Sequence, residues 1–317
     1  MNRVLITGSS GYFGGKLVEY LAEKLDVEEV VGVDLSPPGN RNNKLAFYQR
    51  DVRAPSDDLM RKHRVDTVIH AAWVLPPIHD KAKMEDININ GTKAVLESVL
   101  KAGVGQLLYT SSTTAYGFHP DNDDPLTETS PLRGNDDFTY SKCKRLVDKL
   151  VQDFAQEHPD ITVAIVRPCF VVGPGFNNPL ANHLRKRIVL MPSPRSPLQF
   201  VHEDDLVEAM YQLLVQGKAG IYNVAGDGVI SADEMVRILG NVPLPLPFKV
   251  LWFLNNLGWY LRLRFLTEFP SPALNLLRYR WVAANDKLKK EIGFKYRYDS
   301  KAAFEDFARH VEQSTNR

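Results

Sequence analysis

The chain has 317 residues and a mass of 35.8 kDa, and 44% of its side chains are hydrophobic and 24% charged. This composition predicts a globular protein of one or two domains and excludes a disordered or collagen-like chain. Its 39 basic and 38 acidic side chains nearly cancel, so we expect no nucleic-acid partner. Two cysteines, Cys143 and Cys169, are too few for a disulfide framework or a metal cage. No apolar run reaches the roughly 18 residues of a membrane span, so we predict a cytoplasmic protein with no metal site.

Strand-like and helix-like segments alternate from the first residues to about residue 168. A strand at Val4–Thr7 and a strand at Val30–Asp34 flank a helix, whose apolar residues are Leu17, Val18, Leu21 and Leu25. Further strands are predicted at 45–50, 67–72, 106–112 and 162–167, and helices near 82–102 and 138–157. This alternation predicts an α/β fold with a doubly wound parallel sheet of the Rossmann type.

The pattern changes after residue 168, where glycines and prolines interrupt the chain as far as residue 197. A strand near 199–201, a helix at about 203–216 and a strand at 221–224 lead back to the sheet, and a capping box at Ser231 begins another helix. We predict a Rossmann domain of residues 1–173 plus about 201–226. A smaller, interleaved C-terminal substrate lobe takes 174–200 and 227–317, with a hinge at the proline-rich segment 243–247.

A glycine motif between the first strand and the first helix indicates a dinucleotide site. Gly8, Gly11 and Gly14 allow a tight turn and let a pyrophosphate approach the backbone N–H groups at the helix N-terminus. A tight turn before any helix gives the same three glycines. Asp34 follows Gly14 by twenty residues and ends the second strand, where a carboxylate can accept both ribose hydroxyls and repel a 2′-phosphate. NAD is therefore favoured over NADP, although Arg41 leaves NADP open.

A possible catalytic group combines a phenol, an ammonium and a hydroxyl. Tyr140 and Lys144 stand one helical turn apart, so both head groups can reach one site. A nearby ammonium favours the phenolate and brings a phenol into the working range of a base. Alone, such a pair is typical of a solvated helix surface. Ser111 and Ser112, however, end a predicted strand at the carboxyl edge of the sheet, where α/β sheets bind ligands.

Taken together, these features resemble the extended short-chain dehydrogenase/reductase family, which includes NAD-dependent sugar-nucleotide epimerases and dehydratases. Further motifs that carry the resemblance are Asp51-Val52, His70-Ala71-Ala72, Asn88 to Thr92, Tyr116-Gly117, Arg167-Pro168 and Phe200 to Asp205. The resemblance implies that Ser112 orients the substrate oxygen, with Ser111 as the alternative. It also implies that Tyr140 is the acid/base, and that Lys144 tunes Tyr140 and holds the nicotinamide ribose.

The resemblance also implies the residues that contact cofactor and substrate. The expected NAD contacts are Gly8, Ser10, Gly11, Tyr12, Phe13, Gly14, Asp34, Asp51, Val52, Ala71, Ala72, Asn88 and Pro168. The expected substrate contacts are Ser111 and Thr113, together with Trp73 and Val74, which we expect there only from their position after the fourth predicted strand.

Two departures from the family pattern narrow the range of reactions and substrates that we expect. Thr113 and Thr114 stand where dehydratases carry acidic residues, which disfavours dehydration. Leu198 stands where many sugar-nucleotide members carry an arginine for a diphosphate. Four other cations could replace that arginine, namely Arg185, Lys186, Arg187 and Arg195.

The segment 248–281 is aromatic and basic, with three of the four tryptophans and only one acid, Glu268. It could form an aromatic core of the small lobe, a protein interface, or an apolar lid over a lipophilic alcohol or ketone. As a lid it would suit members that resemble hydroxysteroid dehydrogenases, and its flanking cations could rest on an anionic membrane.

The leading interpretation is an NAD-dependent oxidoreductase that interconverts a small secondary alcohol and ketone, with a lipophilic substrate. The alternative is a sugar-nucleotide epimerase that keeps its NAD, and the third is a non-catalytic NAD-binding regulator. We also predict a homodimer, from apolar rows on two helices such as Val95 with Val99 and Val147 with Val151.

Overall fold

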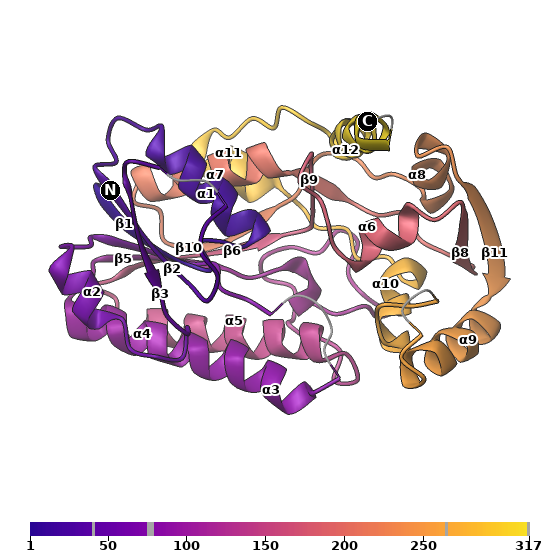
Figure 1. Cartoon of the computed structure of the whole chain (residues 1–317), viewed down its shortest axis with the longest axis horizontal. Coiled ribbons are helices and arrows are strands. Elements are labelled where there is room, and N and C mark those ends of the chain that lie inside the picture. The colour runs from indigo at the N-terminus through magenta and orange to yellow at the C-terminus, as the bar shows by residue number, and fades with distance from the viewer. Residues whose placement is uncertain (40–41, 75–78, 264–265, 316–317) are drawn as a thin grey trace.

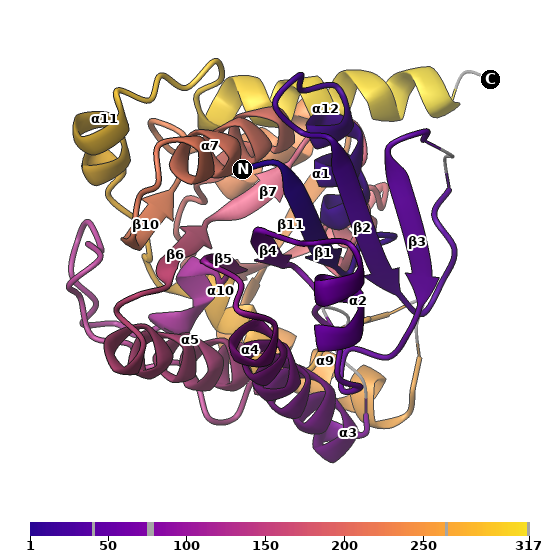
Figure 2. The ribbon, with the colours of Figure 1, turned by 90° about the vertical axis from the view of Figure 1, so that its left-hand side faces the viewer.

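The computed structural model of the chain describes residues 1–39, 42–74, 79–263 and 266–315. Within these ranges, seven parallel strands form one central sheet. They are β1 (Arg3–Thr7), β2 (Glu29–Asp34), β3 (Leu45–Gln49), β4 (Thr67–His70), β5 (Gln106–Thr110), β6 (Thr162–Pro168) and β10 (Gly220–Val224). Their order in space is β10-β6-β5-β4-β1-β2-β3, so the chain starts near the middle and winds outwards in both directions (Figure 2). The predicted doubly wound Rossmann-type sheet is confirmed.

Helices cover both faces of this sheet (Figure 1). One face carries α1 (Tyr12–Ala22), α7 (Glu203–Val215) and α11 (Asp286–Ile292). The other carries α2 (Asp57–Lys62), α4 (Gly91–Ala102) and α5 (Thr139–Glu157). A short helix α3 (Lys81–Glu85) and a π-helical turn (Asp86–Asn90) lead directly into α4, so together they fill the predicted helix at 82–102.

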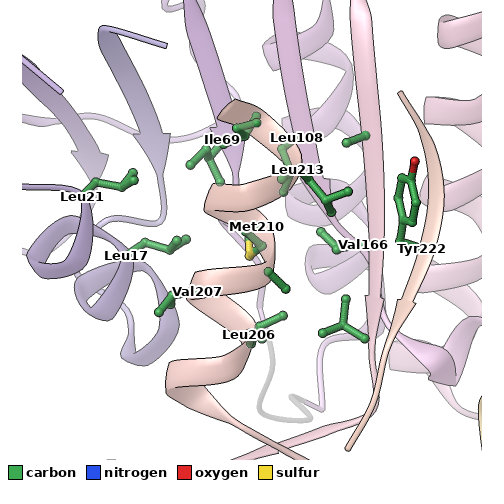
Figure 3. Close-up of a cluster of buried hydrophobic side chains, with 14 of the residues drawn as sticks. Leu17, Leu21, Ile69, Leu108, Val166, Leu206, Val207, Met210, Leu213 and Tyr222 are labelled. Atoms are coloured by element: carbon green, nitrogen blue, oxygen red, sulfur yellow. The ribbon is translucent and has the colours of Figure 1, made fainter. Parts of the chain in front are cut away.

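Buried strands with two covered faces are apolar throughout, because alternate side chains enter different layers. Ile69, Leu108 and Val166 point to one face, where they meet Leu17 and Leu21 of α1 and several residues of α7 (Figure 3). The α7 residues there recur at helical spacing and are Leu206, Val207, Met210 and Leu213. The neighbours Val68, Leu107 and Ile165 enter the cluster on the opposite face. This packing fixes the carboxyl ends of β4, β5 and β6, where the site lies.

The remaining elements form a lobe beside the carboxyl edge of the sheet. It contains two pairs of parallel strands, β7 (Phe170–Val172) with β9 (Phe200–His202) and β8 (Ile188–Ser193) with β11 (Val242–Pro247). Its helices are α6 (Pro179–Leu184), α8 (Ala232–Ile238), α9 (Phe248–Tyr260), α10 (Asn275–Arg278) and α12 (Ser300–Thr315). Across the described ranges, no helix is both long enough and apolar enough to cross a bilayer.

Three expectations about the fold are wrong or need adjustment. The segment 243–247 is no hinge but strand β11, where proline alternates with leucine and leaves every second N–H for pairing. Leu25 lies beyond the end of α1 at Ala22 and is fully exposed. Residues 283–294 contribute Ala283, Leu288 and Phe294 to the buried cluster under the sheet, so this part of the C-terminal region packs on the Rossmann sheet.

Candidate active site

A cavity of about 620 Å³ lies at the carboxyl edge of the sheet and extends into the lobe. The loops that follow β1, β2, β4, β5 and β6 line one part of it. Segments from 170 to 180 and from 269 to 281 line the other part. The carboxyl edge is where the crossover connections of a doubly wound sheet leave room for a ligand.

The glycine loop after β1 forms the floor of the cavity, and its shape requires glycine at two positions. Gly8 has φ +74°, and a Cβ there would lie 2.6 Å from Cα of Ala72. A Cβ on Gly14 would lie 1.9 Å from the carbonyl oxygen of Gly8. Gly11 precedes the first residue of α1, so the helix N-terminus and its free N–H groups are at the cavity. The loop therefore fits a pyrophosphate.

Tyr12 joins this loop to the start of α7 and to the chain at Gly175. Its hydroxyl donates a hydrogen bond to the carboxylate of Glu203, the first residue of α7. Its ring lies over Gly175, where a Cβ would approach the Tyr12 Cε2 atom to 2.6 Å. Lys16, one turn further along α1, pairs with both Glu203 (3.3 Å) and Asp204 (2.8 Å). The glycine loop and α1 are thus fastened to the start of α7.

Asp34 lies at the end of β2, as the sequence predicts, and lines the cavity. Its carboxylate accepts hydrogen bonds from the backbone N–H groups of Ser10 (3.0 Å) and Ser36 (3.1 Å), which fix its position. A carboxylate so placed suits ribose hydroxyls and disfavours a phosphate on the same ribose. Arg41, which left NADP open, lies outside the described residues.

Asp51 and Val52 also line the cavity. The carboxylate of Asp51 is bound by Arg53 at 2.6 Å, and this hydrogen bond lowers the pKa of Asp51 below its ordinary value. Arg53 in turn pairs with Asp86, so the Asp51 side chain is engaged by protein. Val52 packs against Gly91, where a Cβ would lie 2.6 Å from a methyl group of Val52.

The catalytic candidates come from two neighbouring elements. Ser112 follows β5 and caps a short 3-10 turn (Thr113–Ala115), its hydroxyl accepting from the N–H of Thr114 (3.2 Å). Tyr140 lies in the first turn of α5, and its phenol faces Ser112 and Thr114. Burial raises the pKa of Tyr140 to about 12, and the nearby hydroxyls of Ser112 and Thr114 partly offset that rise. Ser112 thus meets Tyr140 at the cavity wall.

Lys144 lies one turn after Tyr140 and is 3% exposed. Its ammonium donates to the carbonyl oxygen of Thr110 (2.9 Å) and lies 3.6 Å from the centre of the Trp73 ring. Burial lowers the pKa of Lys144 to about 7, an effect that the charge of Asp148 partly offsets. The tuning of Tyr140 by Lys144 stays a prediction.

Ser111 points away from Tyr140. Its hydroxyl donates to Asp148, which also receives Nε and Nη2 of Arg167 at 2.9 and 2.8 Å. Asp148 and Arg167 are both fully buried, and Arg167 continues to the hydroxyl of Tyr116 at 2.9 Å. Ser111 therefore belongs to a network beneath the site, although part of it reaches the cavity wall.

The lobe side of the cavity is mostly apolar, and Asn177 and Asn178 are polar residues in its lining. Aromatic and aliphatic side chains line it, namely Phe118, Phe138, Phe170, Phe176, Leu180, Phe269, Ala273, Leu276, Leu277 and Trp281. Two of the four cations considered for a diphosphate are engaged elsewhere: Arg195 pairs with Asp233, and Arg185 donates to the carbonyl oxygen of Phe176. Among the described residues, none of the four lines the cavity, because they follow α6 or lie beside α8. That expectation is wrong.

Comparison with known proteins assigns the chain to a family. Residues 4–225 match the model of the NAD dependent epimerase/dehydratase family. The chain belongs to this family. An uncharacterized protein of Mycobacterium tuberculosis is 28% identical over 315 residues, which are 96% of this chain and 83% of that protein. The UDP-glucose 4-epimerase of Erwinia amylovora is 29% identical over 194 residues, 57% of this chain and 54% of that protein.

Solved structures support the same fold. The UDP-glucose 4-epimerase of Thermotoga maritima, crystallised with UDP-glucose, has a TM-score of 0.78 at 18% identity and covers 99% of both chains. The UDP-glucose-4-epimerase of Stenotrophomonas maltophila, with bound NAD and formylated UDP-arabinopyranose, has a TM-score of 0.77 at 20% identity over the whole of both chains. The predicted membership of the extended short-chain dehydrogenase/reductases is thus confirmed, and this epimerase/dehydratase family member is an NAD-dependent enzyme.

In this epimerase/dehydratase family member, the cavity gathers most of the residues singled out in the sequence. Every expected NAD contact except Asn88 lines the cavity, as do Trp73, Val74, Ser112, Tyr140 and Lys144. Asn88 lies in the π-helical turn, and its side-chain oxygen accepts from the N–H of Val74 (2.9 Å). Thr113 is buried and its hydroxyl donates to the carbonyl oxygen of Pro168. Asn88, through its side-chain oxygen, and Thr113, through its hydroxyl, bind backbone and support the cavity wall from behind.

Sequence reasoning missed Thr114 as a neighbour of Tyr140, and it missed most of the apolar wall. A signal for Asp148 was present, since it follows Lys144 by four residues and so lies on the same helix face. The residues of the apolar wall show no such local pattern in the sequence. Phe118, Phe170 and Trp281 meet in space, with ring centres 4.8 and 5.2 Å from that of Trp281, but they are up to 163 residues apart in sequence.

Proposed function

We propose that the chain is an NAD-dependent oxidoreductase that interconverts a lipophilic secondary alcohol and its ketone. One observation carries this proposal: the phenol of Tyr140 opens onto a cavity whose lobe side is mostly apolar, with Asn177 and Asn178 as polar residues, and whose described lining there includes no cation. Sugars and diphosphates require hydrogen-bond donors and charges, whereas such a wall favours hydrocarbon.

The NAD site fits the residues present. The glycine loop would take the pyrophosphate, Asp34 the adenosine ribose, and Lys144 the nicotinamide ribose. When bound, NAD accepts the hydride from the alcohol carbon or returns it to the ketone. Two residues of the cavity lining, Trp73 and Thr110, carry buried polar atoms (Nε1 and the hydroxyl oxygen) that have no hydrogen-bond partner among the described residues.

In the proposed reaction, Ser112 donates a hydrogen bond to the substrate oxygen and holds it beside Tyr140. The phenolate of Tyr140 takes the hydroxyl proton as the carbon gives up its hydride, so the alcohol loses two electrons and becomes the ketone. In the reverse direction, Tyr140 returns the proton to the oxygen. Because the pKa of Tyr140 is about 12 in the protein alone, the positive charges of Lys144 and of the bound cofactor must lower it during oxidation.

A sugar-nucleotide epimerase is the alternative, and the family assignment keeps it open. It would use the same three residues, but it would hold NAD throughout the cycle and return the hydride to the other face of a transient ketone. A non-catalytic NAD-binding regulator is least favoured, because Ser112, Tyr140 and Lys144 are all present around one cavity.

We also propose a cytoplasmic homodimer, but not through the rows named from the sequence. Val95, Val99, Val147 and Val151 are all buried in the core between the sheet and helices α4 and α5. They cannot face a second copy. The outer faces of the same helices expose Leu100 and Leu146, and a dimer would have to use these faces. A monomeric mass in light scattering would reject it.

The proposed reaction can be tested with a panel of secondary alcohols and ketones, from short aliphatic compounds to rigid polycyclic ones, followed by the absorbance of NADH. We expect turnover to improve with the hydrophobic size of the substrate. Tyr140→Phe should lower kcat by about 10²- to 10⁴-fold while NADH still binds. Tyr211→Phe, which removes a hydroxyl that bonds Asp26 far from the cavity, is the matched control. Equal kcat in Tyr140→Phe and the wild type would reject the mechanism.

A further inference from the structure

Helix α9 exposes a stripe of large apolar side chains. Val250, Phe253, Leu257, Tyr260 and Leu261 are all exposed, Phe253 by 65% and Tyr260 by 83%. Their spacing of three and four residues places them within an arc of roughly 100° on one side of the helix. Single exposed apolar residues are ordinary, but a contiguous stripe of five on one helix indicates a surface that is covered in use.

The charged residues that flank this stripe along the chain are all basic. From residue 235 to residue 267 the sequence has no acidic residue and four basic ones, Arg237, Lys249, Arg262 and Arg264. Lys249 and Arg262 flank the stripe at the two ends of α9, and both are exposed. Arg264 lies outside the described residues. Apolar side chains with basic flanks are complementary to a bilayer that contains anionic lipid.

The opposite side of α9 is fastened to the wall of the cavity. Asn255 is 6% exposed, and its side-chain nitrogen donates to the carbonyl oxygen of Phe269 (3.0 Å) and to the hydroxyl of Ser271 (3.2 Å). Ser271 in turn donates to the carbonyl oxygen of Trp252 (3.1 Å). The segment that begins at Phe269 supplies Phe269, Ala273, Leu276 and Leu277 to the cavity. One layer of protein therefore separates the exposed stripe from the apolar wall.

His79, which follows β4 in the chain, also contacts this helix. His79 stacks on Trp259 of α9, with ring centres 4.1 Å apart and planes inclined by 20°. Trp73 and Val74, five and six residues earlier in the chain, line the cavity. Helix α9 is thus packed against two of the segments that surround the substrate side of the site.

We propose that the exposed stripe of α9 is a membrane-docking surface, which binds the interface of a bilayer that contains anionic phospholipid. Phe253, Leu257 and Tyr260 enter the headgroup region, and Lys249 and Arg262 contact lipid phosphates. This surface places the apolar wall of the cavity beside the bilayer, so a lipophilic substrate can be exchanged with the membrane. The docking itself does not depend on the proposed reaction.

Sedimentation of the full chain with vesicles tests this proposal. Vesicles of phosphatidylcholine alone are compared with vesicles in which about one third of the lipid is phosphatidylserine. We expect binding to the mixed vesicles that weakens as salt is raised. The double variant Phe253→Ser/Leu257→Ser should bind at least about tenfold more weakly, because both side chains point to solvent in the free protein. Lys249→Glu should weaken binding only to the mixed vesicles.

The matched control is Leu25→Ser/Val215→Ser, which removes two exposed apolar side chains from the Rossmann domain and should bind vesicles like the wild type. Absence of binding to either vesicle would overturn the proposal, and so would an equal loss in both double variants. A dimer that the α9 variant converts to a monomer, with no vesicle binding, would show that a second copy covers the stripe instead. These readouts involve no turnover, so a failed substrate panel leaves them unaffected.

Discussion

The indole of Trp73 covers the ammonium of Lys144, with Nζ 3.6 Å from the ring centre. The edge of the Tyr140 ring faces the same indole, so Trp73 contacts both members of the helix pair. Together with the carbonyl oxygen of Thr110, the indole face stabilises a charge that is otherwise buried in protein. Lys144 is thus held by protein groups, and a bound nicotinamide ribose would add to these contacts or replace them.

The first prediction concerns Trp73. Because Trp73 lines the cavity beside Lys144, bound NADH should quench its fluorescence. Trp73→Phe should lose more of the NADH-dependent quench than Trp259→Phe, whose ring lies outside the cavity on α9. A fluorescence titration with NADH measures both. An equal loss in the two variants would place the nicotinamide away from Trp73.

Lys144 should make stability depend on pH. Its pKa is about 7 in the folded chain against 10.5 for an exposed lysine, so the unfolded chain binds more protons between these values. The free energy of unfolding should therefore rise as the pH rises from about 7 to 10.5. Below pH 7, Lys144 is charged in both states, so the full unfavourable effect of burying its charge remains. Lys144→Met should raise the free energy of unfolding at pH 6 by about 1 kcal/mol or more, and should flatten the rise.

Urea unfolding of the cofactor-free protein at several pH values measures this effect. Lys149→Met is the control, since Lys149 lies on the same helix but is 73% exposed. An unchanged slope in Lys144→Met would mean that another group titrates in this range.

Asp148 should be important for stability, because it compensates the buried charge of Arg167. Removal of one partner leaves the other buried and unpaired, so Asp148→Asn should lower the free energy of unfolding by about 3–5 kcal/mol. Asp153→Asn, on an exposed carboxylate of the same helix, should change it by less than about 1 kcal/mol. Similar values for the two variants in chemical denaturation would contradict the proposed role of the pair.

Asp34 should set the preference between the two nicotinamide cofactors. Its charge repels a 2′-phosphate, so the wild type should bind NADH at least about tenfold more tightly than NADPH. Asp34→Asn keeps an oxygen for the N–H groups of Ser10 and Ser36 but removes the charge. The difference in affinity, measured by NADH and NADPH fluorescence, should then shrink to a few-fold. Tight NADPH binding by the wild type would refute this.

Leu276 tests the apolar wall. It is partly buried and lines the cavity, so Leu276→Ala should lower kcat/KM for a lipophilic ketone by about tenfold through KM. NADH affinity should stay unchanged, because Leu276 belongs to the lobe side. The exposed Leu146→Ala serves as the control in the same assay. A kcat/KM equal to that of the wild type would show that this wall does not bind the substrate.

The sequence located most residues of the cavity wall near the glycine loop, because short local patterns determine their positions. Gly14 is required by a close backbone contact within one turn, Gly8 by its positive φ, and Asp34 lies at a strand end. The lobe side escaped prediction because Phe118 and Trp281 come together only through the tertiary fold. Hydrophobic periodicity also does not distinguish an apolar helix face that packs on the protein's own core from one that packs on a second copy. For that reason the sequence alone predicts Val95 at a dimer interface, although this residue lies in the core.

The fate of the cofactor separates net oxidoreduction from epimerisation most directly. Freshly purified protein is dialysed and denatured, and the released nicotinamide cofactor and small molecules are identified and quantified by mass spectrometry. The proposed oxidoreductase exchanges its cofactor in each turnover, so we expect far less than one NAD per chain and reversible rebinding of added NAD. Near-stoichiometric NAD that survives dialysis, released together with a nucleotide sugar, would contradict the proposal and identify an epimerase.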